Sequence, residues 1–244
     1  MISRTISIIV ANWWFYLLFA AVILVSVAAV DAGIVKSGSG VVNTILWLMF
    51  ARFVHHASLY GVRFGAPNPD GTPYRPFDGF VWRGLALLFL SLVLALPLIF
   101  YAAGPAAPYV DPTLPNLLPF IIAFLIIYAI LLSLLGSWLP ASVYKQNTSL
   151  GAAFKRGIRN FLRVLLWIAP TLLVAIVVEF TLLIGSVFSG VPVGVVQGGS
   201  FNPAGTLLTL VITSIESVSV SLISVGLSHF YLEAEGVEEP ALKS

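Results

Sequence analysis

The sequence predicts an all-α protein, a polytopic helical membrane protein with six transmembrane helices arranged as three hairpins. Of its 244 residues, 59% are hydrophobic and only 9% are charged, and the mean hydropathy is +1.02. A soluble domain carries about a quarter charged residues. Apolar runs of about 18 or more residues, long enough to cross a bilayer as helices, recur along the chain. Basic residues are concentrated in alternate loops between these runs, which favours an even number of spans.

Six apolar segments make up the predicted spans. The first is longer than the apolar core of a signal peptide, and no small-residue cleavage site follows it cleanly, so we expect it to be retained. We expect one transmembrane domain over residues 1–232 and an acidic cytoplasmic tail over residues 233–244. The predicted spans cover residues 13–35, 41–60, 81–102, 117–139, 164–188 and 203–231.

The distribution of lysine and arginine predicts the orientation of the chain. With six spans, only Lys36 falls in a loop on the outer side, and Arg52 lies inside the second span near its end. The excess of basic residues on the other side places both termini in the cytoplasm. The ten residues on that side are Arg4, Arg63, Arg75, Arg83, Lys145, Lys155, Arg156, Arg159, Arg163 and Lys243.

The second, fourth and sixth predicted spans end in similar sequences. They read ASLY at 57–60, ASVY at 141–144 and LSHFY at 227–231. The third and fifth spans are preceded by FVWRG at 80–84 and FKRG at 154–157. Three related hairpins with similar inner ends would explain the pattern. The alternative is the general enrichment of tyrosine at membrane interfaces. The tyrosines that end the three spans are Tyr60, Tyr144 and Tyr231.

An Asn-Pro-Ala sequence at residues 202–204 is the motif that aquaporins carry twice. The Asn-Pro at Asn68 is followed by prolines and charges, which forbid the short apolar half-helix that an aquaporin needs there. Gly205 stands where aquaporins carry an arginine. Asparagine is a favoured N-cap and proline is favoured at the first helical position. We therefore interpret the motif as the start of the sixth helix.

Two carboxylates, Glu179 and Glu216, lie within the fifth and sixth predicted spans. Intramembrane carboxylates often mark ion or proton pathways. Small hydroxyl residues line one side of the sixth helix around Glu216. They are typical of tight helix packing, and the alternative is a hydrated path in which Glu216 binds a cation or proton. Packing is favoured because no second polar span faces this side. We call these residues the hydroxyl stripe: Thr209, Thr213, Ser214, Ser217, Ser221, Ser224 and Ser228.

Three histidines are the candidate metal ligands. His55, His56 and His229 fall near the inner ends of even-numbered spans, so they share one membrane depth. Neighbouring histidines on a helix point about 100° apart and do not both face one ion easily. We therefore favour interfacial histidines over a metal or haem site.

The sequence carries no signature of an enzyme. It has no cysteine, which excludes thiolate metal sites and cysteine nucleophiles. The nucleophile elbow, the His-Glu-x-x-His motif and the phosphate-binding glycine loop are also missing. We expect no catalysis and no cofactor. The pI near 9 reflects few charges overall and does not indicate nucleic-acid binding.

Residues 149–163 predict an amphipathic helix on the cytoplasmic membrane surface. Ser149 is a plausible N-cap, and apolar side chains share one side of the helix. Such a helix lies at the headgroup boundary, where its cations contact anionic lipid. The alternative pairs these cations with the glutamates of the tail, but exposed ion pairs contribute little individually. We therefore expect lipid contact from Lys155, Arg156, Arg159 and Arg163.

The stretch NTSLGAAFKRGIRNFLRVLLWIAP at 147–170, about one tenth of the chain, resembles a pattern in bacterial membrane proteins. These proteins are similar to the membrane domain found beside some glycerophosphodiester phosphodiesterases. The resemblance implies a six-helix protein of the bacterial inner membrane and transfers no catalytic residue.

Two functional hypotheses follow. The first is an accessory or organising component that acts without catalysis, through helix packing and contact with anionic lipid, with other membrane proteins or itself as further partners. The second is a transporter or channel for a small solute or ion, which would use Glu216, Thr209, Thr213, Ser217 and Glu179.

Overall fold

The computed structural model describes residues 1–35, 39–67, 79–103 and 114–242. Over these residues the chain is helical apart from connecting turns and one antiparallel ribbon of two short strands, so the all-α prediction is confirmed. The strands are β1 (Val196–Gln197) and β2 (Ser200–Phe201). The helices are α1 (Ile2–Ala11), α2 (Trp13–Asp31), α3 (Ser39–Tyr60), α4 (Gly79–Ala103), α5 (Leu114–Leu135), α6 (Trp138–Tyr144), α7 (Leu150–Phe188) and α8 (Pro203–Glu235).

Four helices of the described chain are long and apolar enough to cross a membrane, namely α2, α4, α7 and α8. The count becomes five when α5 and α6 are taken as one bent span. A multi-pass membrane protein is therefore compatible with the fold. Helix α3 is not among these spans, and it buries the polar side chains of Arg52, His55, His56 and Ser58.

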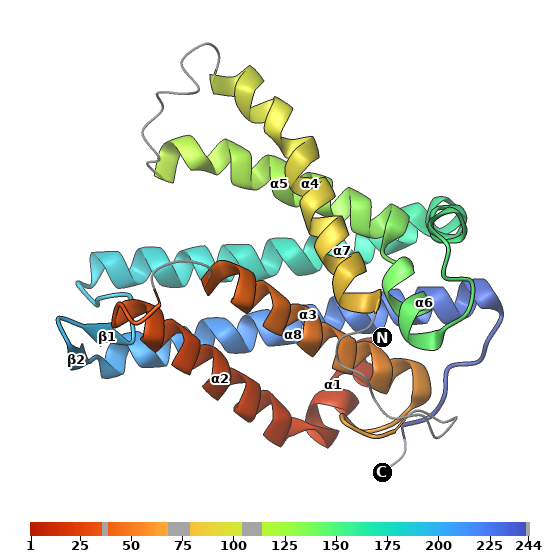
Figure 1. The fold of residues 1–244 in the computed structure, drawn as a ribbon, viewed down its shortest axis with the longest axis horizontal. Coiled ribbons are helices and arrows are strands. Elements are labelled where there is room, and N and C mark those ends of the chain that lie inside the picture. The colour runs from red at the N-terminus through yellow and green to blue at the C-terminus, as the bar shows by residue number, and fades with distance from the viewer. Residues whose placement is uncertain (36–38, 68–78, 104–113, 243–244) are drawn as a thin grey trace.

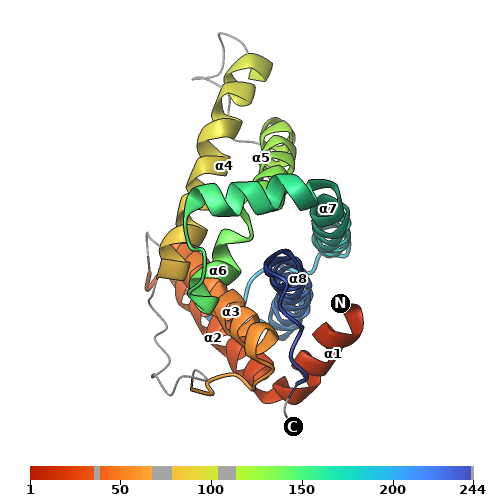
Figure 2. The same ribbon diagram turned by 90° about the vertical axis from the view of Figure 1, so that its right-hand side faces the viewer.

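Helix α8 is the central element of the bundle. It lies against α1, α2, α3, α6 and α7, whereas α5 packs between α4 and α7. Figure 1 shows α7 and α8 running side by side along the long axis, and Figure 2 shows α8 nearly end-on, next to α3, α7 and α1. The close approach of α7 and α8 depends on Gly226, because a Cβ there would strike the indole of Trp167. That indole N–H donates to the Leu222 carbonyl at 2.9 Å.

The predicted surface helix at 149–163 and the predicted span at 164–188 form one continuous helix, α7. The predicted cap is confirmed, because the Ser149 hydroxyl accepts a hydrogen bond from the Ala152 N–H at 3.2 Å. Gly157 lies against the Leu134 carbonyl of α5. The first turns of α7 are therefore docked onto the bundle instead of forming a separate helix.

The predicted span at 117–139 is broken by a bend. Helices α5 and α6 meet at 44°, and Gly136 lies at the break. A Cβ at Gly136 would strike the Leu132 carbonyl and the Leu227 side chain. The bend turns α6 toward α3 and α8, and this places Tyr144 beside the ends of both helices.

Both ends of the described chain are held against the bundle. Helix α1, which is too short to be recognised as a span, buries Ile8. Asn12 joins it to the turn after α3, because its Oδ1 accepts from the Phe64 N–H at 2.8 Å. The predicted tail boundary at 233 falls inside α8, which ends at Gly236 in a left-handed turn. The returning chain then places the Ala241 carbonyl against Gly61.

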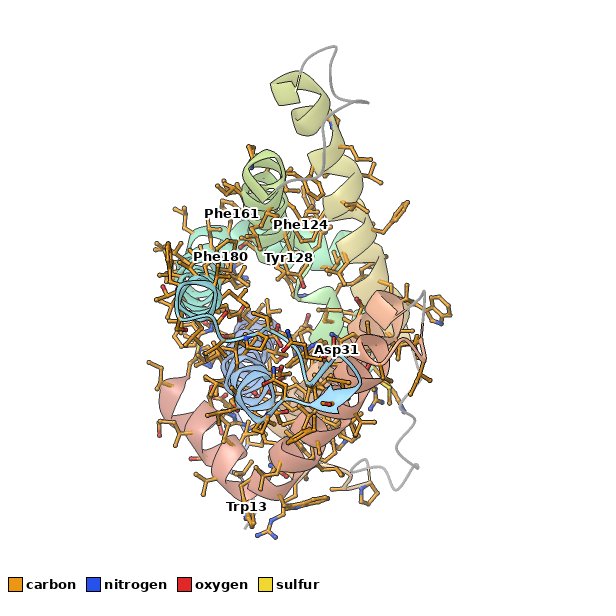
Figure 3. The ribbon with its side chains drawn as sticks, turned by 90° about the vertical axis from the view of Figure 1, so that its left-hand side faces the viewer. Trp13, Asp31, Phe124, Tyr128, Phe161 and Phe180 are labelled. Carbon is orange, nitrogen blue, oxygen red and sulfur yellow. The ribbon has the colours of Figure 1, made fainter. Side chains whose placement is uncertain are left out.

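The loop between α7 and α8 is fastened by two polar side chains. Asp31, at the end of α2, accepts from the backbone N–H groups of Val195 at 2.6 Å and Val196 at 3.3 Å. Figure 3 shows Asp31 beside the two-stranded ribbon. The Asn202 side chain accepts from the Gly205 N–H at 3.2 Å, and Pro203 begins the helix. The Asn-Pro-Ala sequence is therefore a helix cap in this fold.

Candidate functional site

Three tyrosines from distant parts of the chain meet at one end of the bundle. The rings of Tyr60 and Tyr144 stack with centroids 5.5 Å apart, and Tyr231 meets Tyr144 edge-on at 6.0 Å. The Tyr60 hydroxyl donates to the Val143 carbonyl at 3.2 Å, and the Tyr231 hydroxyl donates to the Gln146 carbonyl at 3.1 Å. We call Tyr60, Tyr144 and Tyr231 the tyrosine cluster. It joins the ends of α3, α6 and α8.

Arg156 is buried beside the tyrosine cluster. Its guanidinium lies over the Tyr231 ring, 5.0 Å from the centroid, and Nη1 lies 2.7 Å from Glu235 Oε1. It also donates to the Asn147 carbonyl and the Ser137 hydroxyl, each at 3.2 Å. Only 9% of the side chain is exposed. Arg156 therefore departs from the outward direction expected of a lipid-contacting cation, because a buried guanidinium needs internal partners and finds them here.

Other basic side chains also pair with the glutamates near the C-terminus. Arg163 lies 2.6 Å from Glu233, with both side chains largely exposed. Arg4 lies 3.0 Å from Glu239, which also lies 3.4 Å from the His229 ring. Burial lowers the pKa of the Arg4 guanidinium, and the charge of Glu239 acts in the opposite direction. The alternative pairing with the tail glutamates is therefore the one observed for Arg156 and Arg163.

Two cations of the same segment remain directed outward. Lys155 and Arg159 are exposed and form no ion pair with any residue in the described part of the chain. They line an open pocket of about 370 Å³ where α7 passes the end of α8. Glu235 lies in the same pocket, but its carboxylate is occupied by Arg156. We call this the basic pocket, and its residues are Asn147, Ala152, Lys155, Arg156, Arg159, Ala234 and Glu235.

The two sequences that precede the third and fifth predicted spans occupy similar environments. Arg83 lies over the Trp138 ring at 5.2 Å, as Arg156 lies over Tyr231. The glycine after each arginine marks a close helix contact, with Gly84 against Leu48 and Gly157 against Leu134. In both short sequences the arginine therefore lies over an aromatic ring, and the glycine that follows it allows a close helix contact.

Most of the hydroxyl stripe is buried between helices. The Ser221 hydroxyl lies 2.7 Å from the Tyr16 hydroxyl of α2, and the Ser228 hydroxyl lies 2.8 Å from His55 Nδ1 of α3. Ser217 and Ser221 also donate to carbonyls one turn earlier in α8. Ser214 departs from the predicted face, because it is exposed and lines a groove between α7 and α8. The buried members serve helix packing in this fold.

The candidate carboxylates lie outside these hydrogen bonds. Glu179 of α7 and Glu216 of α8 are both partly buried, on two helices that pack against each other. Thr213 and Ser217 are buried, whereas Thr209 is partly exposed and donates to the Gly205 carbonyl at 2.9 Å. Of the five residues that the transport hypothesis would use, the three hydroxyl residues are therefore either hydrogen-bonded or buried by helix packing. Over the described residues, the two carboxylates have neither a hydrogen bond nor full burial.

The histidines do not form a common site. His55 bonds to Ser228, while His229 faces Glu239, and His56 packs edge-on to the Tyr60 ring at 5.0 Å. No group of three or more His, Cys, Asp or Glu side chains suited to a metal ion occurs over the described residues.

Sequence reasoning missed Asn147 as a member of the basic pocket, and it considered Glu235 only as one of the tail glutamates in the alternative pairing. Asn147 Nδ2 donates to Glu235 Oε2 at 2.6 Å. The only sequence signal for Glu235 was its negative charge, which is opposite to the positive charge of the 149–163 segment.

Comparisons with protein-family models, curated proteins and solved structures find no match to this chain.

Proposed function

We propose that this chain is a non-catalytic integral membrane protein whose basic pocket binds the phosphate of anionic phospholipids. The observation that carries the proposal is the outward direction of Lys155 and Arg159 beside an internally neutralised Arg156. Arginine presents a planar fork of donors that fits phosphate oxygens, and lysine adds a point charge. Two exposed cations that form no ion pair in the described chain and line one open pocket favour an anionic ligand.

The surroundings of the pocket favour a lipid as the source of that phosphate. An apolar row on the same stretch of α7 is exposed, with Phe154 47% and Leu162 68% accessible. An exposed apolar row beside cations fits the boundary between headgroups and acyl chains. The row consists of Leu150, Phe154, Ile158 and Leu162.

The proposal includes the full topology expected from the sequence. Six spans in three hairpins, with both termini in the cytoplasm, would place the basic pocket at the cytoplasmic leaflet, which is rich in anionic lipid. The paired Arg4 and Glu239 hold the first helix and the C-terminal residues at one end of the bundle. The resemblance to bacterial six-helix membrane proteins favours the inner membrane. The role proposed is that of an accessory or organising component, with other membrane proteins or a second copy as partners.

Lipid-dependent stability tests this function. Purified protein is reconstituted in neutral and in anionic nanodiscs, and its melting temperature is measured. Wild type should gain stability from anionic lipid, and Lys155→Gln with Arg159→Gln should lose most of that gain. Arg63→Gln, an exposed arginine on the turn after α3, is the matched control. An equal gain in all three proteins would refute a specific pocket.

Transport of a small solute or ion is the second candidate function. The observation that favours it is that two partly buried carboxylates, Glu179 of α7 and Glu216 of α8, lie on long helices that pack against each other. Buried or half-buried carboxylates in a membrane are costly unless they serve a cation or proton. Glu216→Gln in proteoliposomes tests the idea, because lost cation or proton flux with unchanged stability supports transport. Unchanged flux eliminates it.

A further inference from the structure

A partly open cavity of about 280 Å³ lies between α3, α4, α5, α6, α7 and α8, apart from the basic pocket. Its walls are mostly apolar or aromatic, and they include Trp47, Leu132 and Leu227. With His55 neutral, the side chains of the described residues that line this cavity carry no formal charge. A cavity of about 150 Å³ already admits benzene when it is apolar. This one has room for a substituted ring.

His55 presents a polar atom to the cavity from α3. The side chain is 1% exposed and lines the cavity wall. Its Nδ1 is bonded to the Ser228 hydroxyl at 2.8 Å, and its ring packs 5.3 Å from Phe80. Nε2 has no hydrogen-bond partner among the residues placed by the structure. A largely buried histidine whose second ring nitrogen has no protein partner and which lines a cavity points to a ligand or water there.

Tyr128 presents a second polar atom from α5. Its ring stacks on Phe124 at 5.9 Å, with the two planes 5° apart. The hydroxyl also has no hydrogen-bond partner within the described ranges, and Tyr128 lines the same cavity. Figure 3 shows Tyr128 on the side of α5 that faces the interior of the bundle. Two helices therefore offer hydrogen-bonding groups to one apolar space.

We propose that this cavity binds a neutral, membrane-soluble ring compound with carbonyl or hydroxyl oxygens, of the quinone or quinol class. The apolar walls favour a neutral ligand, because a charge buried there without a counter-charge is costly. A ring with oxygens on opposite edges offers one oxygen to His55 and the other to Tyr128. The aromatic walls suit stacking against a planar ring. The assignment concerns binding alone and includes no electron transfer.

Tryptophan fluorescence provides the test, because Trp47 lines the cavity and quinones quench indoles on contact. Protein in nanodiscs is titrated with a benzoquinone that carries a decyl tail. Wild type should show saturable quenching, which Trp47→Phe should largely remove. Tyr128→Phe should weaken binding by about 2- to 10-fold, the effect of one neutral hydrogen bond. Tyr16→Phe is the matched control, because that hydroxyl is bonded to Ser221 and does not line the cavity.

A second pair of variants distinguishes loss of the cavity from misfolding of the protein. Ala51 also lines the cavity. Ala51→Leu should fill the space and abolish saturable quenching, whereas Ala51→Ser should retain it. Size-exclusion profiles establish that both variants are folded. Quenching that is non-saturable and equal in all variants would show simple partition into lipid and overturn the proposal. Equal competition by a decyl-tailed benzene without oxygens would overturn the quinone class.

Discussion

The Nη1 atom of Arg156 lies 2.7 Å from Oε1 of Glu235, and this pair decides which cations of α7 can meet a ligand. The pair joins α7 to the last turn of α8. It removes one positive charge from the basic pocket and leaves Lys155 and Arg159 to provide the net attraction for an anion. The pair is largely buried, so its two members are strongly interdependent.

Loss of the Glu235 carboxylate should destabilise the fold. Glu235→Ala leaves the Arg156 guanidinium buried without its counter-charge, and we expect a cost of about 2–4 kcal/mol. Arg156→Lys should also destabilise the fold. An ammonium group cannot stack flat on the Tyr231 ring while donating hydrogen bonds to several acceptors, as the planar guanidinium does. Unfolding in detergent measured by circular dichroism tests both. Glu233→Ala is the control with an exposed partner, and an equal effect from it would contradict the assigned role of burial.

Gly226 should not tolerate a side chain. Gly226→Ala would force the Trp167 indole away from α8, and overpacking of this kind costs about 1–3 kcal/mol. Gly151→Ala is the matched control, because a Cβ there meets nothing within 4 Å. The control should be neutral or slightly stabilising, since alanine is the better helix former. Thermal unfolding of the two variants measures the difference, and a Gly226→Ala protein as stable as wild type would refute the close α7–α8 contact.

The Asn202 side chain should act as a structural cap. Asn202→Ala should cost about 1 kcal/mol for the lost cap. It also removes the hydrogen bonds from Nδ2 to the carbonyls of Pro192 at 3.0 Å and Gly194 at 2.8 Å. Asn202→Asp keeps the side-chain oxygen that caps the helix but loses the Nδ2 donor, so it separates the effect of the cap from that of the two hydrogen bonds. Stopped-flow swelling of proteoliposomes should show no water flux that depends on Asn202. Water flux that vanishes in the alanine variant would reverse our interpretation.

Both termini should lie in the cytoplasm. The ion pair between Arg4 and Glu239 places residues near the two ends at the same side of the bundle, and the bias of basic residues assigns that side. A cytoplasm-active reporter fused after Ser244 should therefore be active. Activity of a periplasm-dependent reporter at the same position would invert the topology.

Local signals in the sequence predicted the caps and most helix positions correctly. Ser149 and Asn202 cap α7 and α8 as expected, because capping depends on a few neighbouring residues. The break at Gly136 was not predicted, since glycine alone does not end an apolar helix, and the neighbour that a Cβ there would strike, Leu227, is distant in the sequence. Helix α1 was missed because its ten residues are too few for a span.

The tertiary pairings could not be read from the sequence. A helical wheel placed Arg156 in one arc with Lys155 and Arg159, although Arg156 is buried and the other two are exposed. The packing of α7 against the last turns of α8 brings Glu233 and Glu235 to that helix, and no local pattern encodes this. By contrast, the repeated endings with Tyr60, Tyr144 and Tyr231 did point to residues that meet in the fold.

Direct counting of bound lipid tests the central claim most sharply. Native mass spectrometry of the protein released from mixed micelles, with an anionic phospholipid titrated against a neutral one of equal chain length, resolves individual bound lipids. We predict one preferred anionic lipid on wild type, with affinity reduced about fivefold for each of Lys155→Gln and Arg159→Gln. Arg63→Gln should bind as wild type does. Identical anionic-lipid binding by wild type and the double variant would contradict the proposed function.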